Sequence, residues 1–576
     1  MLLTRPALTA DDATATALLN CLVREVCAPE QQVWADDGEH LVVRLPRVGV
    51  TLRAGLARPP SGPTYRLTPP FEERRGDAWI GAGWERLADL VAGELELATG
   101  QANPEFLAQV RDSHSALKVI LRARAEGTDD GRAQDHGRPA AGGRVAGGGR
   151  GAEDPHSAGG GCRRTAPVTP SVEAYVASEQ SLLSGHRFHP SPKARQGDPA
   201  QWLPYAPEVN ARFQPRWLAV REELLIQEGD GTAFDTLDKL GPAAPGGHRL
   251  LPAHPWQLSL LSDRPVLRRA FAEGLVHDLG PAAPEVVPTS SVRTAYVPDA
   301  DVFCKFSLDI RITNCVRKNA WYELTGAVAL NDIVQHVFTS LDDCVFLAEP
   351  AYRSVTLADR GLHEGLGVIL RQGIGGLTGT PLLSAALADP YGSTLSPLPV
   401  MATPEGALAW WDAYVRKVAR PALRAYLEHG VVLEAHLQNV LVAVDEEGMP
   451  VQTAFRDLEG TKLTPAWHDR LAHLPPRVRE ALTYDTGRAW NRVVYCLLVN
   501  HLTEVAAAVA DLHPGIDADL WPTARPHFAS CGDHPHLRAL LAGVPFPAKA
   551  NLRARWARAA DRAATYVPVP NPFARS

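Results

Sequence analysis

The sequence predicts an α+β fold, because strand-like runs of alternating or continuous apolar residues lie between segments whose apolar residues recur at helical spacing. The clearest pair of strands is 440–444 and 451–455, joined by a turn-like segment at 445–450. Helical spacing is clearest after Trp84 and around Trp410. A chain of 576 residues can hold several such units, and its length suggests about three to four domains.

Composition argues against a nucleic-acid or membrane partner. The formal net charge is −7, with 45% apolar and 21% charged residues, so no basic excess favours nucleic acid. The most apolar run, 492–512, is interrupted by Asn500, His501 and Glu504. The first residues lack a basic segment followed by a long apolar one, and the eight cysteines form no Cys-x-x-Cys pair. We therefore expect a cytoplasmic protein with reduced cysteines.

The N-terminal region, 1–166, is predicted to be an α/β domain. Thr9 can cap a helix over 10–27, short strands follow over 33–55, and helices are expected from Trp84 and over 104–124. Between 127 and 167 the only large aliphatic residue is Val145. Such a segment cannot bury enough apolar surface to fold, so we predict a disordered, Gly-rich insertion there.

A basic loop follows a helix predicted over 172–183. It carries His186, His189, Lys193 and Arg195 on a segment stiffened by prolines. These side chains suit the oxygens of a polyphosphate. Two alternatives stay open: a solvated surface loop, or a zinc site built on His-x-x-His, which lacks a second ligand pair at zinc-finger spacing.

A second polar group lies on two predicted strands. In the first, 286–297, a regular strand would place Ser291 and Arg293 on one face and Thr294 on the other. In the second, Lys305 begins a run whose polar residues alternate with apolar ones as far as Thr313. The polar face could meet water or line a cleft. On a straight strand Lys305 and Thr313 would lie roughly 26 Å apart, at about 3.3 Å per residue.

The predicted hairpin at 440–455 carries the third polar group. Because antiparallel strands return to the same end, Asn439 and Asp457 should lie together at its feet, just after Glu434, His436 and Gln438. Carboxylate and carboxamide oxygens suit Mg²⁺ bridged to a phosphate. The alternative is that Asn439 and Asp457 cap the hairpin and His436 is a core residue.

After a linker at 389–405, the chain from 399 onward is predicted to be mostly helical around this hairpin. Trp410, Trp411 and Tyr414 fall at helical spacing. Such aromatic residues are more often core than ligand platforms, and we expect them to be buried.

Together these motifs resemble the NRPS-independent siderophore (NIS) synthetases of the aerobactin-synthetase type, over about 170–560. The motifs are Gly185-His186-Arg187-Phe188-His189-Pro190 with Lys193 and Arg195, His254-Pro255-Trp256-Gln257, Ser291-Val292-Arg293-Thr294, Lys305 with Thr313 and Arg317, Glu434-Ala435-His436-Leu437-Gln438-Asn439, and Arg456-Asp457. The resemblance implies a cupped-hand architecture with a thumb-like region at 1–166, a fingers-like ATP-binding region at 167–398 and a palm at 399–576.

The resemblance also implies an ATP- and Mg²⁺-dependent ligase of siderophore biosynthesis. It would activate a carboxylic acid, commonly citrate, as an acyl-adenylate and pass it to an amine or alcohol, as a homodimer.

The implied roles fall into three groups. ATP would contact Ser291, Arg293, Thr294, Lys305, Gln438 and Asn439, together with His186, His189, Lys193 and Arg195 of the basic loop. The substrate carboxylate would contact Thr313, Arg317 and His436. Mg²⁺ would contact Glu434, Asn439 and Asp457. Lys305, Arg293, Arg317 and His436 would be the catalytic residues.

Two other functions remain open from the sequence. The His-x-x-Asn then Asp order around the hairpin resembles the order of metal ligands in kinases, which suggests a kinase-like phosphotransferase. A catalytically inactive ATP-binding scaffold is the third hypothesis. Release of AMP and pyrophosphate, rather than ADP, would identify the synthetase.

Overall fold

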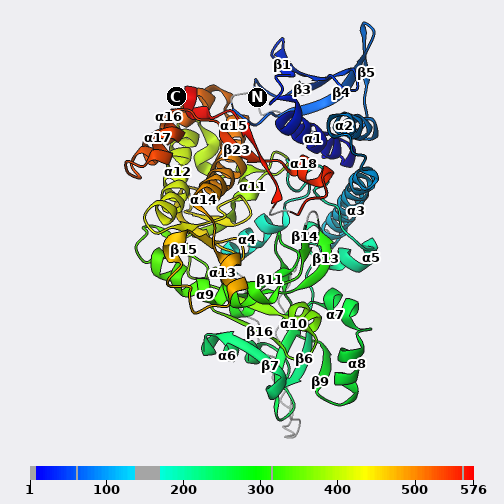
Figure 1. The fold of residues 1–576 in the computed structure, drawn as a ribbon, viewed down its shortest axis with the longest axis vertical. Helices are drawn as coiled ribbons and strands as arrows, with labels where there is room; N and C mark the ends of the chain where they lie inside the picture. Colours follow the sequence, from blue (N-terminus) through cyan, green and yellow to red (C-terminus); the bar gives the residue numbers. More distant parts are fainter. Residues whose placement is uncertain (1–7, 60–61, 136–168, 313–314, 561–562, 576) are drawn as a thin grey trace, which may run out of the picture.

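The computed structural model describes residues 8–59, 62–135, 169–312, 315–560 and 563–575. Figure 1 shows three regions: an N-terminal sheet with its helices at the upper right, a mostly helical C-terminal region at the upper left, and a central region of strands and helices below them. The mixture of helices and sheets confirms the predicted α+β class.

The N-terminal region is a five-stranded antiparallel sheet covered by helices, with strand order β1-β2-β3-β4-β5. Its elements are α1 (Ala10–Leu22), the π-helical turn η1 (Val23–Cys27), β1 (Val33–Asp36), β2 (His40–Leu45), β3 (Val50–Leu56), β4 (Leu67–Arg75), β5 (Ala78–Gly81), α2 (Trp84–Thr99) and α3 (Pro104–Asp135). Thr9 caps α1 as predicted, accepting a hydrogen bond from the Asp12 amide. The expected order of helix, strands and two helices is confirmed.

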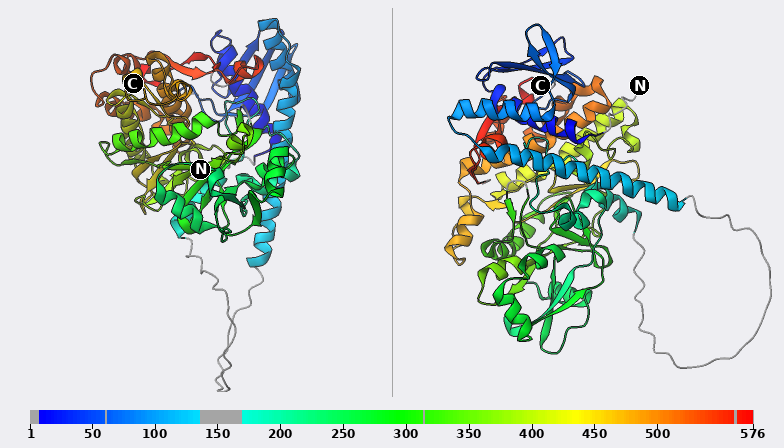
Figure 2. Two further views of the ribbon diagram at one scale, coloured as in Figure 1. Left: turned by 60° about the horizontal axis from the view of Figure 1, so that its bottom comes forward. Right: turned by 90° about the vertical axis from the view of Figure 1, so that its right-hand side faces the viewer.

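Helix α3 is longer than the sequence suggested. It starts at Pro104 as predicted but continues to Asp135, beyond the expected end at 124, and runs along one side of the molecule (Figure 2). The helix continues through 127–135 although six of these nine residues are glycine, threonine or aspartate, which disfavour helix. The predicted disordered insertion is therefore wrong for 127–135, and its remainder, 136–167, lies outside the described residues.

The central region contains two main sheets, with strand orders β10-β11-β12-β17-β16-β7 and β8-β6-β9. Its helices are α4 (Pro170–Gln180), α5 (Pro199–Trp202), α6 (Gly231–Leu240), α7 (Pro255–Leu261), α8 (Pro265–Ala272), α9 (Trp321–Phe338), α10 (Arg360–Leu366) and α11 (Ser384–Ala388). Its strands are β6 (Arg216–Arg221), β7 (Leu225–Gly229), β8 (His248–Ala253), β9 (Val276–Pro281), β10 (Val287–Pro288), β11 (Thr294–Val297), β12 (Val302–Lys305), β13 (Leu308–Ile312), β14 (Cys315–Arg317), β15 (Cys344–Phe346), β16 (Ala351–Val355), β17 (Val368–Gln372) and β18 (Thr380–Leu383).

Both polar strands predicted in this region are interrupted. Residues 289–293 form a turn between β10 and β11, so the expected alternation of Ser291, Arg293 and Thr294 on one regular strand is wrong. The run from Lys305 is also broken after β12, and β13 pairs with β14 in a separate two-stranded sheet. The turn is closed by the Thr294 amide, which donates to the Ser291 carbonyl at 2.6 Å. Each interruption bends polar side chains toward the same part of the molecule.

The C-terminal region is mostly helical around the predicted hairpin. Its elements are α12 (Pro404–Leu427), β19 (Val431–Val432), β20 (Val440–Val444), β21 (Pro450–Phe455), β22 (Lys462–Leu463), α13 (Pro476–Leu482), α14 (Thr486–Val493), the π-helical segment η8 (Val494–Leu502), α15 (Thr503–Leu512), α16 (Asp517–Ala529), α17 (Pro535–Leu541), β23 (Phe546–Lys549), α18 (Asn551–Trp556) and β24 (Tyr566–Val569). Trp410, Trp411 and Tyr414 are fully buried in its core, as expected.

One continuous helical stretch, Thr486–Leu512, has the length and the mean hydropathy, 1.7, of a membrane span. However, 94% of its apolar window is buried inside the fold, where Leu498 and Val505 pack in the main core. The stretch is a core helix of the C-terminal region.

The hydrophobic cores join segments that are distant in the sequence. Leu552 and Trp556 of α18 pack into the N-terminal core, and β15 pairs in parallel with β21 of the hairpin. The three regions therefore share elements across the predicted limits at 166 and 398. Those limits stay a prediction.

Candidate active site

The two feet of the hairpin meet as predicted. Val440 of β20 is paired with Phe455 of β21, and the Arg456 amide donates to the Asn439 carbonyl at 3.1 Å. The next residue, Asp457, has a positive φ of 82°, a conformation that aspartate tolerates better than most residues. This backbone turn directs the chain after Asp457 back toward the same site.

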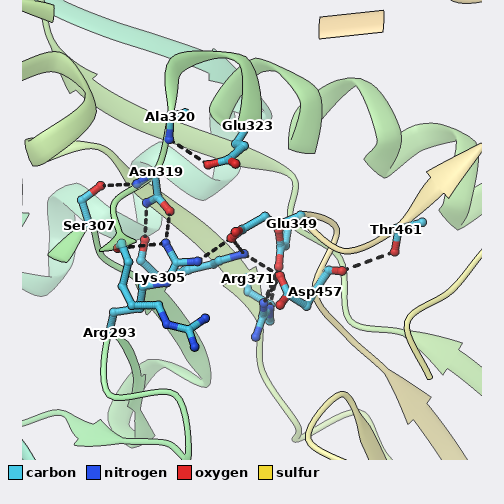
Figure 3. Close-up of polar contacts among 12 residues, drawn as sticks. Arg293, Lys305, Ser307, Asn319, Ala320, Glu323, Glu349, Arg371, Asp457 and Thr461 are labelled. Atoms are coloured by element: carbon cyan, nitrogen blue, oxygen red, sulfur yellow. Dashed lines mark hydrogen bonds and ion pairs between the residues drawn. The ribbon is translucent and has the colours of Figure 1, made fainter. Parts of the chain in front are cut away.

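Lys305 and Asp457 are in direct contact. Lys305 ends β12, and its Nζ donates to Asp457 Oδ1 at 2.5 Å (Figure 3). The Lys305 side chain is only 2% exposed. Burial opposes the charge on Asp457, but Lys305 and Arg371 outweigh it and hold the pKa of Asp457 well below its usual range. Residues 152 positions apart therefore form one charged centre.

A second carboxylate, Glu459, pairs with both predicted phosphate-binding cations. Its Oε2 accepts from Arg293 Nη2 and lies 3.1 Å from Lys305 Nζ. Burial raises the pKa of Glu459, but Arg293 and Lys305 lower it to about 2. Sequence reasoning missed this residue. The sequence feature that could have indicated Glu459 is the spacing Asp-x-Glu soon after the second hairpin strand.

Two buried residues, Asn319 and Glu349, hold the basic side chains of the site in place. Asn319 Oδ1 accepts from Arg293 Nη1 at 2.6 Å, and its Nδ2 donates to the Lys305 carbonyl at 3.3 Å. Arg371 of β17 is paired with Glu349 at 2.5 Å and lies 3.7 Å from Asp457. Figure 3 shows Arg293, Lys305 and Arg371 gathered around Asp457. The cations are thus oriented by the fold before any ligand arrives.

The turn before β11 and the segment before β20 lie together. Gln438 Nε2 donates to Ser290 Oγ at 3.3 Å, next to Ser291. Ser291, Thr294, Gln438 and Asn439 all line one cavity with Lys305. Sequence reasoning thus selected residues that the fold brings into one place.

His436 and Glu434 lie on the wall between two cavities. His436 Nδ1 accepts from the Gln438 amide at 3.3 Å, and its Nε2 lies 3.9 Å from Glu434 Oε2. Burial lowers the pKa of His436, which favours the neutral imidazole. Glu434, predicted to bind Mg²⁺, is held by the Arg492 guanidinium, with Nε at 2.7 Å. Arg317 lines both cavities, whereas Thr313 lies outside the described residues.

The basic loop is less cationic than its sequence suggests. His186 and His189 each accept a backbone amide at Nδ1. Burial, then His189 and Arg24, lower the pKa of His186 to about 3, so it is neutral. Lys193 and Arg195 both pair with Glu208. The zinc alternative has no support in the described residues, where no group of three close ligand side chains includes these histidines.

Two cavities meet at this site. The loop-side cavity, about 430 Å³, is lined by the basic loop. The hairpin-side cavity, about 610 Å³, is lined by Lys305, Arg371, Asp457 and Glu459. Residues that line both are Ser291, Arg293, Arg317, Glu434, His436, Gln438, Arg492 and Lys549. Volumes of this size suit small-molecule substrates.

The chemistry of the hairpin-side cavity favours a polyanion with a divalent cation. Its lining includes nine arginine and lysine residues: Arg293, Lys305, Arg317, Arg371, Arg456, Lys462, Arg488, Arg492 and Lys549. The four acidic residues are Glu323, Glu434, Asp457 and Glu459. Asp457 and Asn439 offer adjacent oxygen ligands of the kind that Mg²⁺ takes beside a phosphate. The residues present therefore fit a magnesium triphosphate.

Two family models and several known proteins match this chain. The model of the IucA / IucC family matches residues 174–389, and that of the ferric iron reductase FhuF-like transporter matches 408–564. The L-2,3-diaminopropanoate–citrate ligase of Staphylococcus aureus is 29% identical over 58% of this chain. The central region of this chain is therefore similar to the IucA / IucC family.

A further relative and a solved structure show the same similarity. The rhizobactin siderophore biosynthesis protein RhbC of Rhizobium meliloti is 31% identical over 58% of this chain. The matched region spans 63% of the length of each of these two relatives. Among solved structures, ATP-bound aerobactin synthetase IucA from Klebsiella pneumoniae gives a TM-score of 0.79 at 22% identity, covering 98% of this chain and 99% of that one. The architecture predicted from the resemblance is thereby confirmed.

Proposed function

We propose that this protein is a member of the IucA/IucC type of NIS synthetases, an ATP-dependent synthetase of siderophore biosynthesis. It joins a carboxylic acid, citrate or a citrate derivative, to an amine or alcohol through an acyl-adenylate. The observation that carries the proposal is the convergence of Lys305 and Arg371 on Asp457, and of Arg293 and Lys305 on Glu459, just after the hairpin. Relatives named for citrate ligation support the substrate class.

In the first step a carboxylate oxygen of the acid attacks the α-phosphorus of ATP. The bond from that phosphorus to the bridging oxygen breaks, and pyrophosphate leaves. Two anions must approach each other, so the barrier falls through positioning and charge neutralisation. Lys305 and Arg293 would contact the phosphates together with Ser291 and Thr294. Arg317 and His436, which line both cavities, would hold the acid between them.

Mg²⁺ would be held by Asp457 and Asn439, and it would neutralise charge on the phosphates. Glu434 would complete this region once its contact with Arg492 loosens. The carboxylates of Asp457 and Glu459 already neutralise Lys305 and Arg293. Binding therefore exchanges protein carboxylates for phosphate oxygens at the same cations.

The basic loop would complete the ATP site from the other cavity. His186 and His189 are candidates for hydrogen bonds as neutral imidazoles. Lys193 and Arg195 would contribute charge only in part, since Glu208 accepts from both.

We place the protein in the cytoplasm and expect a homodimer, which light scattering on the purified chain would test.

Product analysis tests the proposed reaction. The full chain would be incubated with ATP, MgCl₂, citrate and hydroxylamine, which traps activated acyl groups as hydroxamates. We expect AMP, pyrophosphate and citryl hydroxamate in equal amounts. The relatives are named as ligases and synthases, which leaves the kinase-like alternative without support. ADP with a phosphorylated product would restore that alternative and refute the synthetase.

A further inference from the structure

Part of the lining of the hairpin-side cavity has no role in the proposed binding of ATP or of the carboxylic acid. Lys462, Tyr484, Arg488 and Tyr566 line this cavity and not the loop-side one. We call these four residues the basic mouth. Lys462 comes from β22, Arg488 from α14, Tyr484 from the segment just before α14, and Tyr566 from β24, whereas Lys305 and Arg371 come from the central sheet. The mouth therefore forms a separate wall, contributed by the C-terminal region.

Lys462 carries a charge that the fold leaves without a carboxylate partner. Its Nζ donates to the backbone carbonyls of Glu459 and Thr461, the latter at 3.2 Å. Within the described part of the chain, no carboxylate lies within ion-pair distance of it. An ammonium has three donors, so one remains for a ligand. Burial lowers the pKa of Lys462, against the opposing effect of Glu434 and Glu459, and an anionic ligand would relieve this cost.

Arg488 extends the same wall toward solvent. It lies in the first turn of α14, and its guanidinium carbon is 4.1 Å from the centre of the Tyr484 ring. Such stacking orients the planar fork of an arginine, which matches a carboxylate with two parallel hydrogen bonds. The Arg488 side chain is exposed, so an entering ligand meets it first.

A carboxyl on another wall faces the same cavity. Glu323, in the first turn of α9, accepts the Ala320 amide at one oxygen, 2.8 Å away. Its other oxygen has no hydrogen-bond partner among the described residues. The groups that act on it are Glu459, Arg293 and Lys305. Burial and then Glu459 raise the pKa of Glu323 to about 7, so it can accept a proton near neutral pH.

We propose that the basic mouth binds the acceptor, and that this acceptor is an amine that also carries a carboxylate. Lys462 and Arg488 hold the carboxylate, and Glu323 faces the amino group. The amine nitrogen attacks the acyl carbon, the bond from that carbon to the AMP oxygen breaks, and the proton lost by nitrogen passes to Glu323. This inference rests on the proposed function, since it names the second substrate of the same reaction.

Matched pairs of acceptors test the inference in the full chain. The pairs are L-2,3-diaminopropanoate with 1,2-diaminoethane, and L-lysine with 1,5-diaminopentane, which differ within each pair only by the carboxylate. With ATP, MgCl₂ and citrate, we expect kcat/KM to be at least about tenfold higher for the carboxylate member of the reactive pair, because a diamine leaves the Lys462 ammonium without a carboxylate. Hydroxylamine, which needs no acceptor site, reports activation separately.

Substitutions locate the preference. In Arg488→Ala and Lys462→Gln we expect the ratio within a pair to fall toward one. Arg470→Ala is the matched control, since Arg470 lines a different cavity beside Trp467, and should keep the wild-type ratio. Glu323→Gln should slow both members of a pair by the same factor. Each ratio is internal to one preparation, so partial loss of folded protein does not alter it.

The outcomes separate the inference from the function beneath it. If hydroxamate forms but the diamines or spermidine react as well as the amino acids, the inference is wrong. The same holds if no acceptor reacts, or if Arg488→Ala and Lys462→Gln keep the wild-type ratio. If neither hydroxamate nor AMP forms, the proposed function itself fails, and the inference falls with it.

Discussion

At the scale of single residues, the site is a set of cations already occupied by carboxylates. Lys305 is one of only eight lysines in the chain, and it lies in a run of alternating polar residues. In the structure its ammonium contacts Asp457. Glu459 could not be located in the same way, because its position depends on the positive φ of Asp457. A single backbone dihedral angle of that kind is not encoded in periodicity.

Substitution of Lys305 tests whether this centre performs adenylation. We expect Lys305→Ala to lower citrate-dependent AMP formation by about 10²-fold or more, because a preorganised charge near the α-phosphate is lost. Although Lys305 lines the cavity, it is 2% exposed, so its removal leaves Asp457 with only the more distant Arg371, 3.7 Å away, and should lower Tm. Pyrophosphate release and thermal unfolding measure the two effects. Lys239→Ala, on the distant helix α6, is the control, and a wild-type rate in Lys305→Ala would show that the site is misplaced.

At the scale of elements, the sequence identified most helices and strands but not where polar strands stop. The hairpin β20–β21 was predictable from its turn, because its register follows from that turn. The break after β12 was not, since Phe306 and Ser307 continue the alternation of apolar and polar residues. There, tertiary contacts override the local pattern: the Ser307 hydroxyl is bound to the Glu364 carbonyl of a distant helix.

Helix α7 offers a test of pH-dependent stability. His254 caps it by accepting the Trp256 amide at 3.2 Å, and burial lowers the pKa of His254 to about 3. In the unfolded chain His254 binds a proton near pH 6.5, whereas in the folded chain it stays neutral until about pH 3. The free energy of unfolding therefore falls as pH drops from 6.5 toward 3. Between pH 6.5 and 5 this residue alone should account for about 2 kcal/mol.

Asparagine at this position separates the titration from the cap. His254→Asn keeps an N-cap acceptor but cannot be protonated. We expect its unfolding free energy, measured in urea at pH 7 and pH 5, to decline less than that of the wild type by about 2 kcal/mol. His186 and His501, whose pKa values burial also lowers, should leave a residual decline. Equal declines in both proteins would contradict a neutral, buried His254.

At the scale of the whole molecule, the site depends on contacts between regions far apart in the sequence. Glu504 of α15 accepts from Thr64 at 2.7 Å and from Arg187 of the basic loop at 2.9 Å, and it lies 3.6 Å from Arg66. One buried carboxylate thus joins the N-terminal region, the loop and the C-terminal core. Pairing over more than 300 positions is beyond what one sequence can predict, although each participant was visible as an ordinary charged residue.

Neutralising Glu504 should therefore weaken both assembly and catalysis. Glu504→Gln keeps the shape of the side chain but leaves Arg187 buried without its counter-charge, while Arg66 keeps Asp511, at an expected cost of about 3–5 kcal/mol. Because Arg187 adjoins His186, the basic loop should also lose its orientation, and kcat/KM for ATP should fall by about tenfold. Differential scanning calorimetry and AMP release measure the two effects. The exposed Glu405→Gln on α12 is the matched control and should resemble the wild type. If Glu504→Gln unfolds at the wild-type temperature while ATP kinetics stay unchanged, Glu504 does not hold the three regions together.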